Sequence, residues 1–86
     1  MKVLVHVEYV GQRDIVHDYS KKIAEEFNKH GEKCAYRLFA EFSHALYFIY
    51  DNVTEEMYSA STKEITVLLR ELYNTGKIQY YYVSQI

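Results

Sequence analysis

Apolar and polar residues alternate along the first ten positions of the chain. The valines at positions 3, 5 and 7 fall on one side of this alternation, and the other side holds Leu4, His6 and Glu8. A period of two residues is typical of a β-strand with one buried face. The pattern therefore predicts a strand over residues 2–10, which Gly11 ends.

The next segment changes to helical spacing. Apolar residues recur three or four positions apart from Ile15 to Phe27, and charged residues lie between them. This spacing is typical of an amphipathic helix with one solvated face. Asp14 falls in the first turn, where its charge opposes the helix dipole. Gly31 is expected to end the helix, because glycine adopts the left-handed C-terminal conformation without strain.

Two strands and a second helix are predicted in the rest of the chain. The strands are residues 33–42 and the very apolar residues 45–50, joined by a hairpin connection. The helix begins at Thr54, or at residue 62 after the capping box Ser61-x-x-Glu64, and we favour Thr54. Its buried stripe is Ile65, Leu68, Leu69 and Leu72. Gly76 ends the helix, and residues 77–85 form the last strand.

The predicted order is strand, helix, strand, strand, helix, strand. Right-handed crossovers place both helices on one face of a four-stranded antiparallel sheet with strand order 4-1-3-2. The expected fold is therefore a ferredoxin-like βαββαβ two-layer α+β sandwich. With 86 residues, the chain has room for one core, so we expect a single domain over residues 1–86.

Composition and charge narrow the class of protein. Hydrophobic residues make up 49 % of the chain, which is enough to form a core and argues against disorder. The net charge of −2 provides no strong positive field for a nucleic-acid backbone. A single cysteine, Cys34, cannot form an internal disulfide, which suits a reducing compartment. No signal peptide and no apolar run of about 18 residues occurs. We expect a soluble, cytoplasmic protein that does not enter a membrane.

The sheet face without helices, called the open face below, is the expected functional surface. Alternation assigns to it Leu4, His6 and Glu8 of the first strand, Lys33, Ala35, Arg37, Phe39 and Glu41 of the second, and Tyr81 and Val83 of the last. Tyr80 and Tyr82 are then expected to point inward. The third strand presents either Leu46, Phe48 and Tyr50 or Ala45, Tyr47 and Ile49. Such a surface is too apolar to stay in water, so a partner is expected to cover it.

Candidate chemistry on this face is limited. His6, Glu8 and His44 lie on or beside neighbouring strands, and two imidazoles with a carboxylate are a ligand set for zinc or iron. Their spacing is not diagnostic, and we predict no metal and no cofactor. Cys34 is expected to be a small buried hydrophobe, because no base or electropositive site can be placed beside it.

The expected topology is also that of the RNA recognition motif, whose aromatic sheet binds single strands by stacking bases. Tyr47 and Tyr50 match its third-strand aromatics, but the basic-Gly start of that motif is absent from residues 43–50. Gly11-Gln12-Arg13 is a faint match to the acylphosphatase loop, and Glu8 stands where the small CRISPR adaptation nucleases have an aspartate. We assign the chain to none of these families.

Three functional hypotheses follow. The first is a non-enzymatic binding or regulatory module that acts through the open face, as a homodimer or docked on a larger protein. Its expected contact residues are Leu4, His6, Glu8, Arg37, Phe39 and Tyr81. The second is a single-stranded nucleic-acid binder on the same face. The third is a dimeric α+β barrel enzyme with His6 and Glu8 in an intersubunit cavity, although we expect no catalysis.

Overall fold

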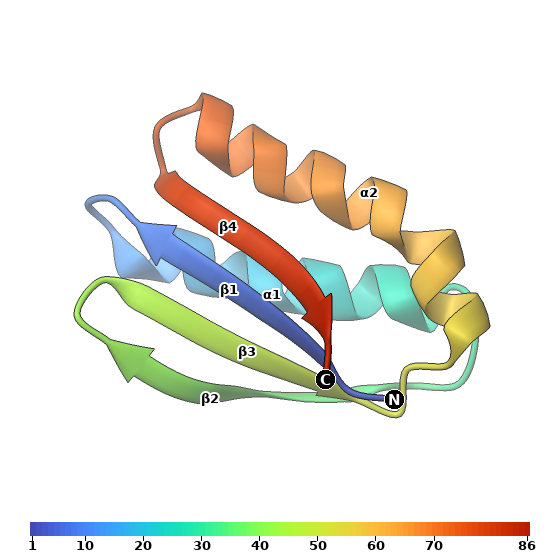
Figure 1. The fold of residues 1–86 in the computed structure, drawn as a ribbon. Helices are drawn as coiled ribbons and strands as arrows, with labels where there is room; N and C mark the ends of the chain where they lie inside the picture. Colours follow the sequence, from blue (N-terminus) through green and yellow to red (C-terminus); the bar gives the residue numbers. More distant parts are fainter.

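The computed structural model describes all 86 residues and contains six regular elements. In chain order they are β1 (Val3–Tyr9), α1 (Arg13–Asn28), β2 (Ala35–Phe42), β3 (Ala45–Asp51), α2 (Glu55–Asn74) and β4 (Ile78–Gln85). The strands form one layer and the two helices form a second layer behind it (Figure 1).

The four strands form one antiparallel sheet in the order β2-β3-β1-β4, which is the expected order counted from the other edge. The fold is therefore the predicted ferredoxin-like α+β sandwich. β1 and β3 are central, and β2 and β4 are the edges. Helix α1 packs on β1 and β3, while α2 packs on β4 and on α1. The opposite side of the sheet carries no helix (Figure 1).

The core lies between the sheet and the helices, and it decides how β3 is oriented. Leu46, Phe48 and Tyr50 are buried in the core cluster together with the valines of β1. The second of the two predicted alternatives therefore holds, and Ala45, Tyr47 and Ile49 belong to the open face. The Tyr50 hydroxyl donates a hydrogen bond of 2.8 Å to the Ser20 carbonyl. Burial raises the pKa of Tyr50 well above its usual value.

Helix α2 begins where the sequence favours it. The Thr54 side chain accepts a hydrogen bond of 3.1 Å from the Met57 amide and so caps the helix. The alternative start at residue 62 is wrong. Ser61 is instead buried in the second turn of α2, and its hydroxyl donates to the Glu26 carbonyl of α1.

Gly31 has a different role from the predicted one. Helix α1 ends at Asn28, and Gly31 does not have a left-handed backbone, unlike Gly11 and Gly76. A Cβ atom at Gly31 would lie 2.6 Å from Cγ and Sδ of Met57. Glycine is needed here because α2 approaches the loop closely.

A bulge in β2 changes which side chains of this strand face outward. Register shifts between Leu38 and Ala40, so Phe39 has no partner on β3. Arg37 lies opposite Ile49 on the open face, as predicted. Glu41 lies opposite Leu46 on the helix side, which corrects the prediction that it faces outward. There it accepts a hydrogen bond of 2.8 Å from Arg13, which lowers the pKa of Glu41.

The predicted orientation of β4 is also wrong. Tyr81 and Val83 lie opposite Val7 and Val5 and pack against the core, whereas Tyr80 and Tyr82 face outward. The prediction assumed that Gln79 and Gln85 mark the outward side of an unbroken alternation. Register shifts at Gln79, and Gln85 remains exposed at the end of the strand although it lies on the helix side. Polar character therefore does not identify the open face on this strand.

Candidate functional site: an aromatic sheet face

Three side chains from adjacent strands form a row across the middle of the open face. Tyr47 of β3 and Tyr82 of β4 both pair with His6 of β1. The rings of Tyr47 and His6 meet edge to face at 4.5 Å, and those of Tyr82 and His6 stack at 5.0 Å. We call Tyr47, His6 and Tyr82 the aromatic row. Tyr80 makes a further edge contact with His6 at 5.5 Å.

These rings bury His6 although it lies on the face without helices. Only 8 % of its surface is exposed. Its Nε2 atom lies 3.1 Å from Oε2 of Glu8, whereas Nδ1 is buried and has no hydrogen-bond partner. An N–H on Nε2 donates to the carboxylate, and this tautomer leaves Nδ1 as an unprotonated acceptor. The buried His6 side chain therefore holds the Glu8 carboxylate in place.

Four aromatic residues of this face, among them Tyr82 of the row, remain in contact with water. Phe42 is 78 % exposed, Tyr80 is 47 % exposed and Tyr82 is 39 % exposed, while Phe39 at the bulge is 61 % exposed. If a fully exposed aromatic side chain presents about 200 Å², the four residues leave about 450 Å² of largely apolar surface in water. The largest apolar patches on monomers reach about 300–600 Å² and are often functional. We call Phe39, Phe42, Tyr80 and Tyr82 the exposed aromatic patch.

The charged residues of the open face lie on opposite sides of the aromatic row. On one side, Arg37 donates a hydrogen bond of 2.7 Å to Asp51, and Lys2 lies 3.6 Å from the same carboxylate. On the other side, Glu8 lies in a row with Phe42, Ala45 and Tyr80. The Arg37 side thus carries one excess positive charge, and the Glu8 side carries one negative charge.

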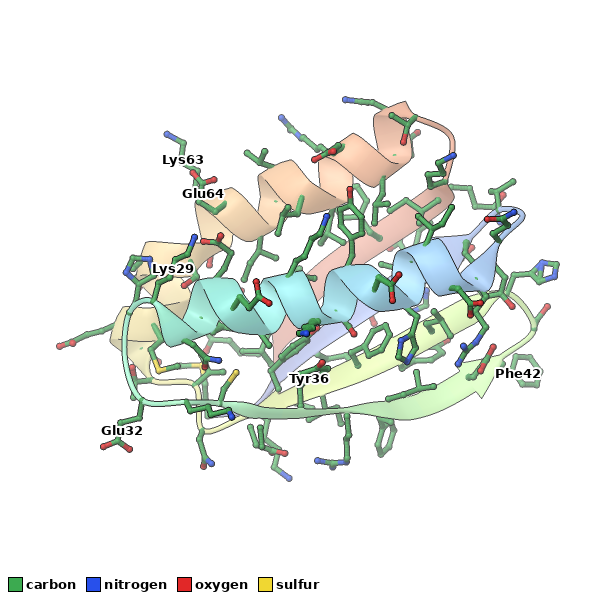
Figure 2. The ribbon with its side chains drawn as sticks, turned by 180° about the vertical axis from the view of Figure 1, so that it is seen from behind. Lys29, Glu32, Tyr36, Phe42, Lys63 and Glu64 are labelled. Atoms are coloured by element: carbon green, nitrogen blue, oxygen red, sulfur yellow. The ribbon has the colours of Figure 1, made fainter.

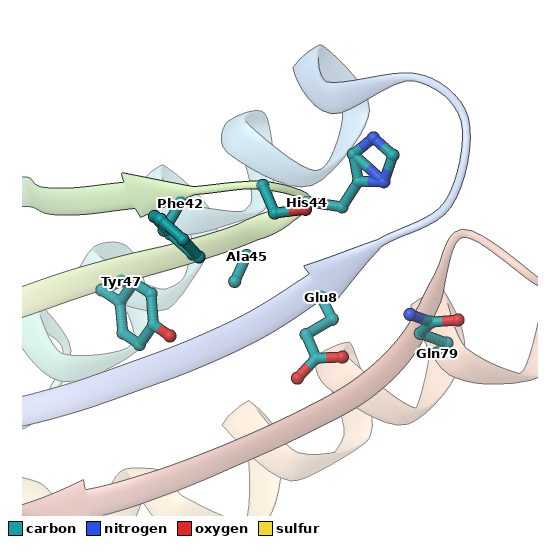
Figure 3. Close-up of a pocket in the computed structure, with 7 residues that line it drawn as sticks. Glu8, Phe42, His44, Ala45, Tyr47 and Gln79 are labelled. Atoms are coloured by element: carbon teal, nitrogen blue, oxygen red, sulfur yellow. The ribbon is translucent and has the colours of Figure 1, made fainter.

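A shallow pocket of about 300 Å³ opens beside Glu8 near the β2–β3 hairpin. It is lined by Glu8, Phe42, Ser43, His44, Ala45, Tyr47 and Gln79. Figure 3 shows Glu8 of β1 and Tyr47 of β3 pointing to the same side of the sheet. In the view from the helix side, Phe42 lies at the hairpin end of β2, away from both helices (Figure 2). A carboxylate between aromatic rings is suited to a cationic group.

The three candidate metal ligands do not form one cluster, because only His6 and Glu8 are in contact. His44 packs on the Tyr9 ring at 5.1 Å and points away from the Glu8 carboxylate (Figure 3). No three His, Cys, Asp or Glu side chains form a group that could hold a metal ion. Cys34 is buried, and desolvation raises the pKa of its thiol, so the reactive thiolate is disfavoured.

Four of the six predicted contact residues lie at paired positions of the open face: Leu4, His6, Glu8 and Arg37. Phe39 belongs to the exposed aromatic patch from its unpaired position in the β2 bulge, and Tyr81 packs against the core. Sequence reasoning missed Phe42 and Tyr82 and did not decide on Tyr47. The valine of β4 provided a usable signal, because Val83 is the more suitable core residue and alternation from it places Tyr80 and Tyr82 outward.

The fold and the face define a small ferredoxin-like α+β domain with an aromatic open face. No family model matches the chain, and no curated protein matches it. It is similar to the de novo designed protein Foldit4, with 12 % identity, a TM-score of 0.58, and coverage of 100 % of this chain and 99 % of that one. It is also similar to the de novo designed protein Ferredog-Diesel, with 15 % identity, a TM-score of 0.56, and coverage of 99 % and 85 %.

A structural-genomics protein, YJCS, is 14 % identical over 100 % of this chain and 99 % of that one, with a TM-score of 0.44. At these identities the two designed proteins show the fold alone, and YJCS adds nothing to that. Neither α1 nor α2 has the length and apolar character needed to cross a bilayer.

Proposed function

We propose that the protein is a non-enzymatic binding module that acts as a homodimer through its open face. The observation that carries this proposal is the exposed aromatic patch, which comes from both edge strands and has no helix over it. Covering about 450 Å² at ~25 cal/mol per Å² contributes on the order of 10 kcal/mol per copy, before the cost of association. A standard interface buries about 800 Å² on each partner, so the patch would form about half of it.

The charge on the outer surfaces of the helices supports the choice of the open face as the interface. The helix surfaces away from the sheet carry charged side chains, among them Lys29, Lys63 and Glu64 (Figure 2). Surfaces rich in charge are poorly suited to the centre of an interface, which is depleted in such residues. A second copy of the open face is the simplest cover, because two-fold symmetry lets one surface serve both partners.

Light scattering coupled to size-exclusion chromatography, over a wide concentration range, tests the proposal. The wild-type chain is expected to change from monomer to dimer as its concentration rises. Phe42→Ser and Tyr80→Ser should each weaken the dimer by about tenfold or more, because aromatic anchors dominate interfaces. Tyr73→Ser is the matched control, since Tyr73 is 51 % exposed but lies on α2. A strict monomer at high concentration contradicts the homodimer and leaves docking on a larger protein.

Single-stranded nucleic acid is a second candidate for the same face. The aromatic row places rings on three adjacent strands, an arrangement on which bases can stack. Phosphates would find few cations, because Arg37 and Lys2 already pair with Asp51. Fluorescence anisotropy with labelled RNA and DNA strands at two salt concentrations tests this candidate. Binding should weaken with salt and with Tyr82→Ala, but not with Tyr73→Ala.

No observation favours the enzyme hypothesis. The pocket on the open face is lined by Glu8 but not by His6, so the two side chains do not share an accessible cavity. We also propose a cytoplasmic location, because the single cysteine is buried and unpaired. Such a chain depends on packing for its stability and gains nothing from an oxidising compartment.

A further inference from the structure

The positive side of the open face, at Arg37, and the negative side, at Glu8, lie at equal distances from the aromatic row and on opposite sides of it. Arg37 lies in the row of paired residues next to it on one side, with Ile49, Leu4 and Ser84. Glu8 lies in the row next to it on the other side. Rotating the face by half a turn about an axis that lies along the aromatic row exchanges these two sides. The half-turn therefore sets the row of Arg37 in one copy against the row of Glu8 in the other copy, with Arg37 itself over Phe42.

Only one of the two simple ways of stacking two copies uses this symmetry. With the two-fold axis along the aromatic row, each strand faces its own counterpart, and Arg37 lies over Phe42 of the other copy. With the axis along the strands, Arg37 lies over Ser84 and Glu8 lies over Ala45, so no cation meets a carboxylate. In the first arrangement Glu8 lies over Leu4, but Arg37 lies over Phe42, which lines the same pocket as Glu8. Because Arg37 faces the row that holds Glu8 only in this arrangement, charge complementarity favours it.

The pocket beside Glu8 provides the matching receptor. Phe42 forms one of its walls, Tyr47 forms another, and no lysine or arginine lines it. The Arg37 side chain is half exposed and holds its guanidinium at the surface through Asp51. A guanidinium over Phe42 would gain a cation–π contact and face the Glu8 carboxylate, which His6 holds in place.

We propose that Arg37 of each copy inserts into the pocket beside Glu8 of the other copy, and that this reciprocal contact sets the orientation of the dimer. This inference rests on the proposed homodimer. Because of the two-fold symmetry, the contact occurs twice in each dimer. The open face thereby selects a second copy of itself over a generic apolar partner.

Charge-reversed variants, studied alone and mixed, test the inference. Glu8→Lys alone sets two cations against each other, and Arg37→Glu alone sets two carboxylates against each other. Each is expected to weaken the dimer about a hundredfold, at about tenfold for each of two like-charge contacts. In an equimolar mixture of the two variants, both contacts of the heterodimer are complementary. The mixture is therefore expected to dimerise about as well as wild type, as measured by sedimentation equilibrium.

The matched controls are Glu64→Lys and Arg70→Glu, two exposed residues of α2. Alone or mixed, they should leave dimerisation unchanged. The inference is overturned if the mixture of Glu8→Lys and Arg37→Glu stays as weak as either variant, or if either variant alone dimerises like wild type. Circular dichroism checks that each variant is folded.

Glu8→Gln and Arg37→Gln keep the outcome clear if a charge reversal disturbs folding. Glutamine at position 8 still accepts a hydrogen bond from His6. If the two residues touch across the interface, the double variant should lose no more affinity than the single variant that dimerises less well. Losses of the two single variants that add up fully in the double variant overturn the inference. A wild-type monomer refutes the homodimer itself, whereas a dimer that depends on Phe42 but not on Glu8 or Arg37 refutes only the orientation.

Discussion

At the scale of single residues, Tyr50 shows how burial changes a titratable group. Its phenol ring is fully buried and its hydroxyl donates to the Ser20 carbonyl. Because burial raises the pKa of Tyr50 well above 10.0, the folded protein keeps this group protonated where the unfolded chain loses the proton. The stability that Tyr50 contributes is therefore fully present below about pH 10 and is lost as the pH rises toward the folded-state pKa.

The stability cost of Tyr50→Phe should be smaller at alkaline than at neutral pH. Near pH 7 the variant is expected to be less stable by about 1 kcal/mol, because the buried hydrogen bond is lost. Near pH 11 the deficit should shrink or change sign, because phenylalanine does not ionise on unfolding. Urea unfolding at both pH values measures the difference. Tyr73→Phe, at an exposed tyrosine, should follow wild type at both, and an equal deficit of Tyr50→Phe at both pH values contradicts this account.

At the scale of elements, the starts of the two helices differ. The Thr54 hydroxyl caps α2, whereas Gln12 makes no side-chain cap hydrogen bond at the start of α1. An uncapped helix start leaves backbone N–H groups to water. The first turn of α2 also packs against the loop at Gly31. The cap at Thr54 therefore also helps to hold this contact between α2 and the loop.

Thr54→Ala is expected to lower the free energy of unfolding by about 1 kcal/mol, because the Met57 amide loses its acceptor. Ser59→Ala, at an exposed position inside α2, is the control and should be neutral or slightly stabilising, since alanine favours a helix interior. Denaturant unfolding of the two variants and wild type makes the comparison. Equal losses from both substitutions would show that the cap has no special role.

At the scale of the whole molecule, a contact between distant segments depends on the absence of one side chain. Gly31 precedes β2, and Met57 belongs to α2. The Met57 side chain lies directly against Gly31. A Cβ at Gly31 would lie 2.6 Å from Met57 atoms, and the Met57 side chain is fully buried. An added methyl group must therefore displace packed atoms.

Gly31→Ala is expected to cost about 1–3 kcal/mol of stability through overpacking. The cost should fall in a Met57→Ala background, which removes both Cγ and Sδ, and thermal or urea unfolding of the double-mutant cycle measures this coupling. Gly76→Ala serves as the contrast, because its cost comes from a positive φ of 75° in open space and should not depend on Met57. A Gly31→Ala cost that is the same in both backgrounds would contradict the steric explanation.

Much of the candidate site could be predicted because it lies on β1. The valines at positions 3, 5 and 7 leave one choice for the core, so Leu4, His6 and Glu8 had to face the other way. Arg37 was placed by the same reasoning, since a cation is costly to bury. What could not be predicted is that tyrosines from β3 and β4 would bury His6, because those rings come from residues about 40 and 75 positions away in the chain.

The sequence by itself determined the order of elements, the fold and the existence of an apolar open face, because local periodicity and chain connectivity are enough for these. Tertiary structure alone decided which aromatic residues occupy that face. Shifts in pairing at Phe39 and at Gln79 reset the alternation of β2 and β4, and Gln85 is exposed at the end of β4 although it lies on the helix side. Strand register depends on packing between distant segments, and spacing within one strand does not encode it.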